Sequence, residues 1–378
     1  MALAMTKQQS GFDILTHPSR LIRIADIDSE LAGLWKQFNE DISEGKTVMR
    51  ACMSNLIIYC DSIEELQQIS HEIPEIVDIH PARVLLLMGN GQPSDGKIEA
   101  LVTMYYQPVS AGWQVCAERI DVIASPDSIE YLPSVARSHL IGDLPTTVWW
   151  VSRQPPPNVP AVFLELAELA NQVIYDNIGW ENPLSGITVM TRWVAARQDS
   201  LIVYNLAWRR LTVFRKLISQ VLDPKVAPDA LNSLKEITIE HGPHALPLTW
   251  LLVGWLAYQL EWKPVTGKRV SSSELFWRFR KNNTDIKVIA RRLPEGEPLI
   301  YELMFDWSRS GKQGRACFKR LDDERIGIVE ERSTVPARVF TAQPPHRSSL
   351  VTSQLARRDR DKFFENALVA ANEMTDVF

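Results

Sequence analysis

The sequence predicts an α/β plus α+β fold class: a three-layer domain with a mixed sheet, followed by a domain of helices and antiparallel strands. The chain has 378 residues, of which 45% are hydrophobic, and this is enough for two cores. Residues 146–151 form a short run of β-branched and aromatic residues between prolines. Within it, the adjacent Trp149 and Trp150 point to opposite faces of a strand, so both faces need cover. We expect the domain boundary near residue 180, which gives domains 1–180 and 181–378.

Hydrophobic spacing and turn residues predict the elements of the first domain. A helix that begins near residue 62 has Asp61 or Ser62 as its cap. Gly112 separates two runs that are typical of an antiparallel pair. The expected helices are 29–42, 62–73, 133–140 and 161–170, and the expected strands are 21–24, 47–60, 80–89, 98–109, 113–124, 146–151 and 173–175.

The second domain begins with helices and then becomes rich in strands. The segment 245–260 is apolar all round, so we expect a buried core helix; its 16 residues fall short of the ~20 that span a bilayer. A meander is expected from about residue 270. The closing helix, 348–374, is expected to break near Asp359 or Asp361. The other expected elements are helices 186–196 and 211–222 and strands 236–240, 275–279, 286–291, 299–305, 315–320 and 325–330.

Composition restricts the class of protein. The net charge of −5 argues against binding that is driven by nucleic-acid phosphates. The first residues, MALAMTKQQSG, lack the basic and apolar regions of a signal peptide, so we expect a cytoplasmic protein. The four cysteines include no CxxC pair, which excludes a zinc ribbon and a thioredoxin-type motif.

No residue pattern predicts a catalytic site, a metal or a cofactor. GNGQPS, from residue 89, imitates a dinucleotide fingerprint, but Ser94 replaces the third glycine and a strand follows, so we interpret it as a surface turn. Gly267 and Lys268 resemble a P-loop fragment without its first glycine, and we expect a linker there. The EHGPH segment, 240–244, is either a turn or part of a ligand cluster, and the turn is favoured.

Two basic segments with aromatic neighbours are candidates for partner binding. In residues 205–223 one helix face is apolar, and four cations lie on or near the other face. These cations suit an acidic partner or a sugar phosphate, although an ordinary solvated face explains them as well. The second segment is 357–362. The candidate residues are Trp208, Arg209, Arg210, Arg215, Lys216, Arg357, Arg358 and Arg360.

Five stretches together resemble the OpcA family, the glucose-6-phosphate dehydrogenase assembly proteins, and specifically its cyanobacterial type. They are HPARVLLL (80–87), GDLPTTVWW (142–150), NLAWRRLTVFRKLI (205–218), LLVGWLAYQL (251–260) and SLVTSQLARRDRDKFFENAL (349–368). The resemblance implies a non-enzymatic partner that promotes the active oligomer of the dehydrogenase in the oxidative pentose phosphate pathway and raises its activity. It also implies control through thioredoxin. The alternative is an α/β enzyme with a hidden sugar-phosphate or nucleotide site, in which Arg209 and Arg210 bind phosphate.

The implied redox control makes Cys52, Cys60, Cys116 and Cys317 candidate redox residues. If 47–60 is one unbroken strand, Cys52 and Cys60 lie about 26 Å apart and cannot form a disulfide. Cys116 is then expected to pair with one of these two, because Cys317 reaches them only across the contact between domains. The other interpretation is that all four are buried and reduced.

Overall fold

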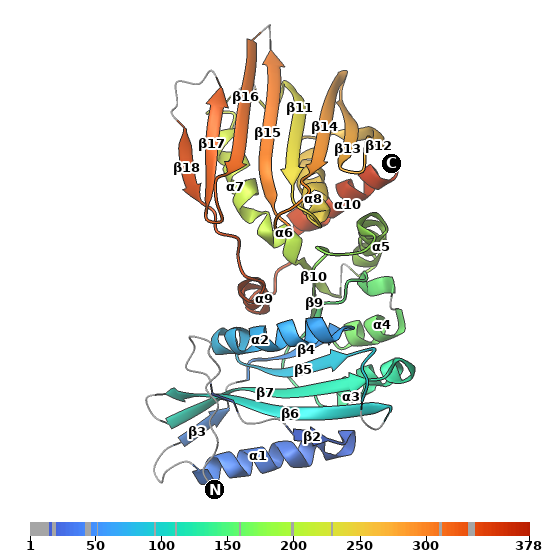
Figure 1. Ribbon diagram of the computed structural model, residues 1–378, viewed down its shortest axis with the longest axis vertical. Helices are drawn as coiled ribbons and strands as arrows, with labels where there is room; N and C mark the ends of the chain where they lie inside the picture. Colours follow the sequence, from blue (N-terminus) through green and yellow to red (C-terminus); the bar gives the residue numbers. More distant parts are fainter. Residues whose placement is uncertain are drawn as a thin grey trace. The chain divides into compact units, whose positions relative to one another are not determined.

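The computed structural model describes residues 15–16, 20–41, 47–50, 52–93, 96–109, 112–158, 160–197, 200–227, 230–309, 312–331 and 337–378. The chain forms two compact units, and each is assembled from separate segments (Figure 1). The first unit is Met1–Asp176 with Arg197–Tyr204 and His346–Arg360; the second is Asn177–Ala196 with Asn205–Pro345 and Asp361–Phe378. The first change of unit thus lies close to the expected boundary at residue 180, but two later segments return to the first unit.

The first unit contains a mixed sheet with the order β1-β6-β7-β5-β4-β8-β9-β10, in which β2 also pairs with β6 and β3 with β7. The pairings from β7 through β5, β4 and β8 to β9 are parallel, and β6 joins β7 antiparallel. Every residue of β4, β8 and β9 is buried, so the Trp149–Trp150 strand is an inner strand, as predicted. The strands are β1 (Leu15–Thr16), β2 (Arg20–Ile22), β3 (Thr47–Arg50), β4 (Ser54–Cys60), β5 (Ala82–Met88), β6 (Ile98–Val109), β7 (Gly112–Ala124), β8 (Thr146–Trp150), β9 (Gln172–Tyr175) and β10 (Ile202–Asn205).

The helices of the first unit largely follow the sequence prediction. Ser62 accepts a hydrogen bond from the backbone N–H of Glu65 and so caps α2, as expected. This helix continues through Pro74 beyond its expected end at residue 73, because the buried Ile76 and Val77 extend its apolar face. The helices are α1 (Ile27–Asp41), α2 (Ile63–Ile79), α3 (Leu132–Ser138), α4 (Pro160–Glu168) and α9 (Arg347–Leu355), with short 3-10 helices at Ile24–Asp26, Pro126–Tyr131 and Pro156–Asn158.

The expectation of one unbroken strand over residues 47–60 is wrong. β3 pairs with β7, whereas β4 pairs with β5 and β8. The chain therefore leaves one ladder and enters another between residues 50 and 54, and the N–H of Met53 donates to the carbonyl of Pro81 at that point. Cys52 lies in this connection and not in a strand.

The second unit contains an eight-stranded sheet with the order β12-β13-β14-β11-β15-β16-β17-β18. The prediction of a simple meander is wrong at one place, because β11 lies between β14 and β15 and runs parallel to β14. The expected linker at Gly267 and Lys268 lies inside β12, where Gly267 pairs with Trp277. The strands are β11 (Leu234–His241), β12 (Lys263–Arg269), β13 (Glu274–Lys281), β14 (Thr284–Arg292), β15 (Ile300–Arg309), β16 (Lys312–Arg320), β17 (Arg325–Glu331) and β18 (Arg338–Thr341).

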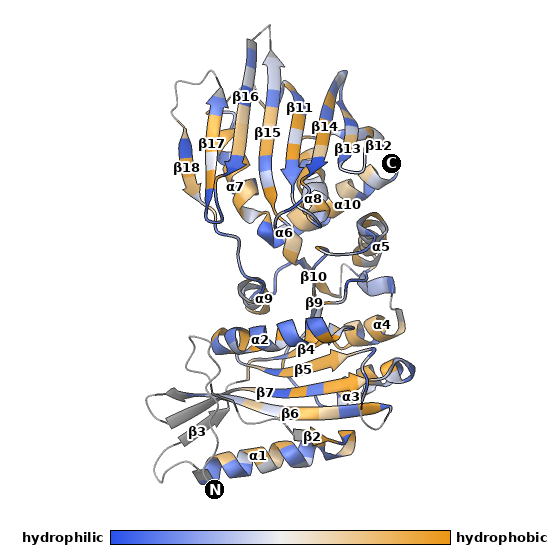
Figure 2. Ribbon diagram, in the orientation of Figure 1, coloured by the Kyte–Doolittle hydropathy of each residue, from blue (hydrophilic) through white to orange (hydrophobic). Residues whose placement is uncertain are grey.

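Helices cover one face of this sheet (Figure 1), and hydrophobic residues alternate with polar ones along its strands (Figure 2). Among the hydrophobic residues, Trp277, Phe279 and Phe305 are fully buried. The rings of Trp250 in α8 and Trp277 in β13 are in edge contact, with 4.7 Å between centroids. The predicted break in the closing helix is confirmed, since Asp361 caps α10. The helices are α5 (Pro183–Ala195), α6 (Leu206–Arg210), α7 (Thr212–Val221), α8 (Leu246–Gln259) and α10 (Lys362–Thr375).

Among the helices that the structure describes, none combines the length and the apolar character that crossing a membrane requires.

Candidate functional site in the second unit

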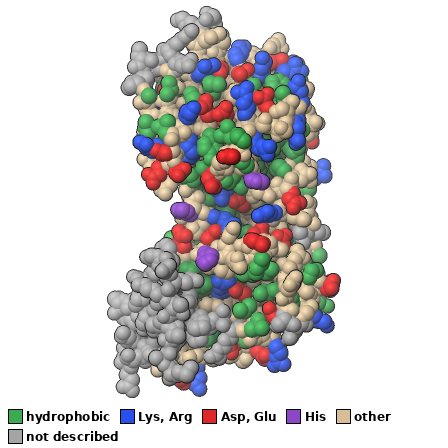
Figure 3. Space-filling model, in the orientation of Figure 1, with side chains coloured by type: hydrophobic (Ala, Val, Ile, Leu, Met, Phe, Trp, Pro, Cys, Tyr) green, Lys and Arg blue, Asp and Glu red, His purple; other side chains and the backbone are tan. Residues whose placement is uncertain are grey.

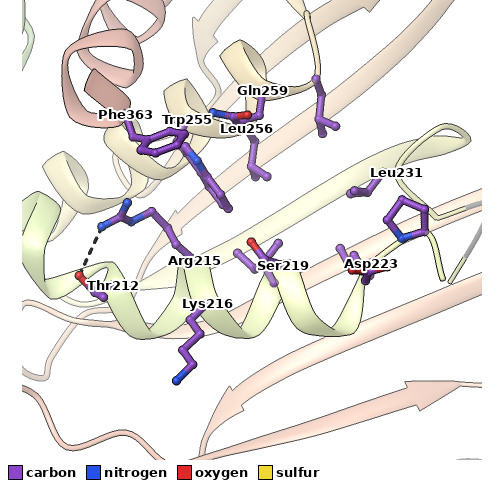
Figure 4. Close-up of a pocket in the computed structure, with 14 residues that line it drawn as sticks. Thr212, Arg215, Lys216, Ser219, Asp223, Leu231, Trp255, Leu256, Gln259 and Phe363 are labelled. Carbon is purple, nitrogen blue, oxygen red and sulfur yellow. Dashed lines mark hydrogen bonds between the residues drawn. The ribbon is translucent and has the colours of Figure 1, made fainter. Parts of the chain in front are cut away.

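A cavity of about 550 Å³ opens between α7, α8 and the first turn of α10 (Figure 4). Its volume lies in the range of sites that bind small molecules or partner side chains. Most of its wall is apolar, with a few polar groups at intervals. The lining residues are Thr212, Arg215, Lys216, Ile218, Ser219, Leu222, Asp223, Pro224, Leu231, Trp255, Leu256, Gln259, Leu260 and Phe363.

Local sequence explains why α6 and α7 are positioned beside this cavity. The side chain of Asn205 accepts a hydrogen bond from the N–H of Trp208 and starts α6. The following helix, α7, buries Phe214, Leu217 and Val221 on its core face. This leaves the adjacent face of α7, which carries Arg215, to line the cavity.

Arg215 is the main charged group of the cavity wall. Its guanidinium stacks 3.6 Å from the ring centroid of Trp208, and its Nη2 donates to the hydroxyl of Thr212 at 3.3 Å. Its Nε–H is buried and has no hydrogen-bond partner among the described residues. Burial lowers the pKa of Arg215 to about 10, Asp361 opposes this shift and Arg209 adds to it, so the group stays charged at neutral pH.

The nearby carboxylate of Asp361 is already engaged by other donors. Its Oδ2 accepts a 2.8 Å hydrogen bond from Nε1 of Trp208, and its Oδ1 accepts one of 3.0 Å from the N–H of Phe364. Arg215 thus offers a positive charge and a buried, unsatisfied N–H within a mostly apolar wall. This combination favours a ligand that carries an anionic group beside an apolar one. The cavity therefore has the chemistry to bind an acidic, partly apolar segment.

The structure separates the predicted partner-binding residues. Arg215 and Lys216 line the cavity, but Figure 4 shows Lys216 pointing away from Trp255 and Phe363. Trp208 is only 1% exposed, so it supports Arg215 from within and cannot itself form a contact surface, contrary to its place among the expected contacts.

The remaining cations lie elsewhere. Arg209 and Arg210 are half-buried, and Arg210 borders a small separate recess with Phe214 and Arg320. The exposed residues Arg357, Arg358 and Arg360 belong to the first unit, so the second candidate segment is divided between the two units after residue 360.

Sequence reasoning missed two aromatic residues of the cavity, Trp255 and Phe363. They come from α8 and α10, far from α7 in the chain. One signal was available, since the paired Phe363 and Phe364 at the start of a helix cannot both point inward. Phe364 is 1% exposed and Phe363 is 59% exposed.

The first unit offers a second place for a ligand, where the strand order reverses between β4 and β8. In parallel sheets, ligands bind at such a switch point, outside the carboxyl ends of the strands. Here Asp61 follows β4 directly, and Glu64 and Glu65 lie in the first turn of α2. The hydroxyl of Ser152, after β8, donates to Asp61 at 2.5 Å. These carboxyl groups repel a pyrophosphate at the start of α2.

The candidate redox cysteines differ in environment. Cys60 is buried, its Sγ lies 3.7 Å from the carbonyl oxygen of Leu87, and burial, with neighbouring carboxylates, raises the pKa of its thiol. Burial and then Glu302 raise the pKa of half-buried Cys317 to about 11. Cys52 is half-buried. The backbone of Cys116 lies in β7, and its side chain is outside the described residues.

Sheet register makes the expected Cys60–Cys116 pairing wrong. Cys60 is opposite Met88 in β5, which is opposite Ile123 in β7. Cys60 is therefore level with a residue seven positions beyond Cys116, about 23 Å along the strand, and two strands away from it. A disulfide needs Cα atoms within about 7 Å.

The EHGPH segment ends a strand and forms a turn, as expected. His241 ends β11, its Nδ1–H donates to the carbonyl of Gly242 at 2.9 Å, and a turn follows in which His244 has a φ of +62°. No cluster of three or more metal-ligating side chains occurs in the described part of the chain. After the GNGQPS segment the chain enters β6, a strand, as expected; Ser94 lies outside the described residues.

Comparison with known proteins identifies the family. The family domain described as "Glucose-6-phosphate dehydrogenase subunit N-terminal domain" matches residues 74–192, and the corresponding C-terminal domain matches residues 202–368. A "Putative OxPP cycle protein OpcA" from Nostoc punctiforme is 29% identical over 314 residues, which are 79% of this chain and 66% of that protein. The protein of the same name from Synechococcus elongatus is 24% identical over 304 residues, 76% of this chain and 66% of that protein. The chain thus spans just under two thirds of either relative.

Among solved structures, one match reaches a TM-score of 0.50, and at its low identity it bears on the fold alone. The super-repressor mutant of Gal80p from Saccharomyces cerevisiae matches with a TM-score of 0.50 at 9% identity, over 86% of this chain and 95% of that chain. A putative oxidoreductase from Parabacteroides merdae matches with a TM-score of 0.49 at 11% identity, over 86% and 97% of the two chains. The two consecutive family domains, found in the order in which their names place them, show that this chain belongs to the OpcA family.

Proposed function

We propose that the chain is a cytoplasmic, non-catalytic subunit that binds glucose-6-phosphate dehydrogenase, promotes its active oligomer and raises its activity. The observation that carries the proposal is the pair of dehydrogenase-subunit domains over residues 74–192 and 202–368. Every residue that lines the cavity beside α7 falls within the second of these domains. We therefore assign this cavity as a contact site for the dehydrogenase.

The chemistry of the cavity supports a protein partner. Phe363 and Trp255 offer aromatic surface, and the stacked Arg215 offers a positioned cation; these residue types are enriched at interface hot spots. A carboxylate on the dehydrogenase would pair with Arg215, and a neighbouring apolar side chain would fill the cavity. Activation follows if the active conformation or oligomer of the dehydrogenase is bound more tightly than the inactive one.

Binding and kinetics of the cognate dehydrogenase test this proposal. We expect Phe363→Ser and Arg215→Gln each to weaken binding about tenfold or more, the usual loss when a hot-spot side chain is removed. Val369→Ser is the matched control, because Val369 lies on the same helix as Phe363 and is 44% exposed but does not line the cavity. Equal affinities for all three variants would exclude the cavity as the contact site. Unchanged dehydrogenase kinetics at saturating protein, with binding confirmed, would exclude activation.

The alternative, an enzyme with a nucleotide or sugar-phosphate site, has less support. The switch point of the first sheet carries Asp61, Glu64 and Glu65, which disfavour phosphate groups. Calorimetric titration with NADP⁺ and with glucose 6-phosphate separates the two functions. A regulator of this kind gives no heat of binding at micromolar concentrations, whereas tight binding with turnover would replace the proposal.

For redox control, Cys52 with Cys116 is the pairing that we propose. Arg50 in β3 is opposite Val115 in β7, so Cys116 lies one residue beyond this pair and Cys52 two residues beyond it. Cys52 lies two residues before the start of β4 and Cys60 is its last residue, so a strand about 20 Å long separates them. Peptide mapping of the oxidised protein should find a Cys52–Cys116 disulfide that thioredoxin reduces, with a change in activation of the dehydrogenase. A bridge to Cys60, or activation that is independent of oxidation, would contradict this pairing.

A further inference from the structure

The eight-stranded sheet of the second unit has an outer face that the described helices of this unit leave uncovered (Figure 1). Side chains alternate along each strand. In β13, for example, Trp277 and Phe279 are buried on the helical side, whereas Phe276 and Arg278 are partly exposed on the outer side. Figure 3 shows hydrophobic side chains intermixed with both kinds of charge over this unit.

The register of the sheet aligns a mostly apolar row across the middle of this outer face. Six neighbouring strands, β13, β14, β11, β15, β16 and β17, contribute one side chain each to this row. Lys268 of β12 continues the row at one end, and its Nζ lies 5.7 Å from the ring centroid of Phe276. The row, in the order of the strands across the sheet, is Phe276, Ile289, Thr238, Met304, Cys317 and Val329. Val329 is 50% exposed.

Two charged rows flank the apolar row, one on each side. Register and alternation place both on the outer face. The first row is Glu274, Arg291, Glu240, Glu302 and Lys319, and the second row is Arg278, Lys287, Glu236, Asp306 and Arg315. The first has two cations and three carboxylates and the second has three and two, so the ten charges sum to zero. The whole chain carries −5, so these two rows contribute nothing to the net charge that would oppose the approach of a second copy.

Ion pairs hold these charges in fixed positions. Arg291 lies 2.9 Å from Glu274, Lys319 lies 2.9 Å from Glu302, and the second row contains an Arg315–Asp306 pair at 2.6 Å. Because each ion pair is partly exposed, its members can also accept an opposite charge from a molecule that packs above them.

We infer that this outer face is an interface with a second copy of the chain. The order of charges in the first row, − + − − + from β13 to β16, becomes + − − + − when it is read from the other end. A two-fold axis along β11 therefore places Glu274 opposite Lys319 of the other copy and Arg291 opposite Glu302, and in the second row Lys287 opposite Asp306. Arg278 then faces Arg315, while Glu236 and Glu240 each face their own counterpart on the axis. Because each pairing of unlike residues occurs twice, six attractive facings outnumber four repulsive ones.

The same axis places Ile289 opposite Met304 and Phe276 opposite Cys317, so the apolar rows also meet. At the two ends of this contact, Lys268 of one copy faces Val329 of the other.

The area of the outer face is large enough for a stable interface with a second copy of the chain. Eight strands at ~4.8 Å spacing and about eight residues per strand give a surface of roughly 34 Å by ~26 Å, about 880 Å². A stable interface buries about 800 Å² on each partner. Two sheets that pack face to face in an aligned arrangement are a common solution for such surfaces.

Sedimentation equilibrium of the full chain, without the dehydrogenase, tests the inference independently of the proposed function. We expect a concentration-dependent dimer. Val329→Lys places a cation opposite Lys268 of the other copy and should weaken the dimer at least tenfold, whereas Val329→Glu should leave it intact or strengthen it. Val369→Lys, a change on α10 at a similarly exposed position, is the control and should have no effect.

Thiol labelling provides a second measurement that needs no substitution. Cys317 lies in the central row, so its alkylation, followed by peptide mass spectrometry, should slow as the protein concentration rises through the dimerisation range. Cys52 of the first unit serves as the internal reference and should not change. A monomer at all concentrations up to about 100 µM, a dimer that responds equally to Val329→Lys and Val329→Glu, or labelling of Cys317 that is independent of concentration would each overturn the inference.

Discussion

A buried carboxyl group, that of Glu65, lies in the first turn of α2 in the first unit. Glu65 is 7% exposed, and its side chain accepts a 3.4 Å hydrogen bond from the N–H of Asp61. Burial, and then the charge of Asp61, raise the pKa of Glu65 from its ordinary value of 4.5 to about 7. Arg153, whose Nε is 3.9 Å away, opposes this shift only weakly.

The pH dependence of stability should reveal this group. Between pH 4.5 and 7 the folded state retains a proton that the unfolded state has lost, so the contribution of Glu65 to stability falls as the pH rises through this window. Above pH 7 the folded protein holds a buried charge near Asp61. Glu65→Gln removes that charge, and should therefore raise the Tm by a few degrees more at pH 8 than at pH 5.

Scanning calorimetry of the wild type and of two variants at both pH values provides the check. Glu64→Gln is the control, because Glu64 is adjacent but exposed, and its two Tm changes should be equal. If the effect of Glu65→Gln were also the same at pH 5 and pH 8, the carboxyl group would not be titrating in this range.

At the scale of elements, close packing of α8 against α10 organises the second unit. Trp250 Nε1 donates to the carbonyl of Ala371 at 2.8 Å. One turn further along α8, a Cβ added at Gly254 would lie 2.5 Å from the carbonyl oxygen of Ala367 and 3.0 Å from the Cβ of Ala371. The absence of a side chain at this position is what allows the two helices to approach.

Two glycine substitutions in helices should therefore have opposite effects. Gly254→Ala forces α8 away from α10 and should destabilise the second unit by about 1–3 kcal/mol, the usual cost of overpacking. Gly33→Ala, in the exposed middle of α1, meets nothing within 4 Å and should stabilise the first unit by about 0.5–1 kcal/mol through helix propensity. Urea unfolding of both variants tests this; destabilisation by both would show that α1 needs its glycine for another reason.

Elements that are defined by local pattern could be predicted from the sequence. β8 and α8 were predicted because their apolar residues and flanking prolines form contiguous signals. The break between β3 and β4 and the insertion of β11 could not be predicted, because each depends on which distant strand supplies the hydrogen bonds. β12 was missed because it is an edge strand with a half-exposed pattern and contains Gly267.

The residues of the candidate site also fall into two groups: those that a local sequence pattern reveals and those that only packing brings together. The cationic helix that lines the cavity was visible as a pattern within a single stretch of chain, with Arg215 and Lys216 among its residues. Trp255 and Phe363 come from helices that lie about 40 and about 150 residues further along, and only packing brings them to the same cavity. The burial of Trp208 likewise depends on Asp361, which a local pattern cannot reveal.

At the scale of the whole molecule, the chain returns to the first unit after it has built most of the second. α9 packs on α2 at a separation of about 275 residues. Nε and Nη2 of Arg347 donate to both carboxylate oxygens of Glu72 at 2.7–3.0 Å, and the hydroxyl of Ser348 donates to Glu75 at 2.6 Å. The guanidinium of Arg347 also lies 5.5 Å from the ring centroid of Trp149. The first unit is therefore complete only when residues near the end of the chain are in place.

Hydrogen exchange of the full chain should show this dependence. Arg347→Ala leaves the carboxylate of Glu72 without its two-pronged partner and loosens α9, so amides of α2 should exchange about tenfold faster or more. Amides of β11, in the other unit, should keep their rates, because opening of the first unit does not require opening of the second. Arg357→Ala, just beyond α9, removes an exposed arginine and should leave α2 unchanged. If α2 kept its protection in Arg347→Ala, the contact with α9 would not be needed to stabilise α2. The segment 346–360 would then lie on the first unit without contributing to its stability.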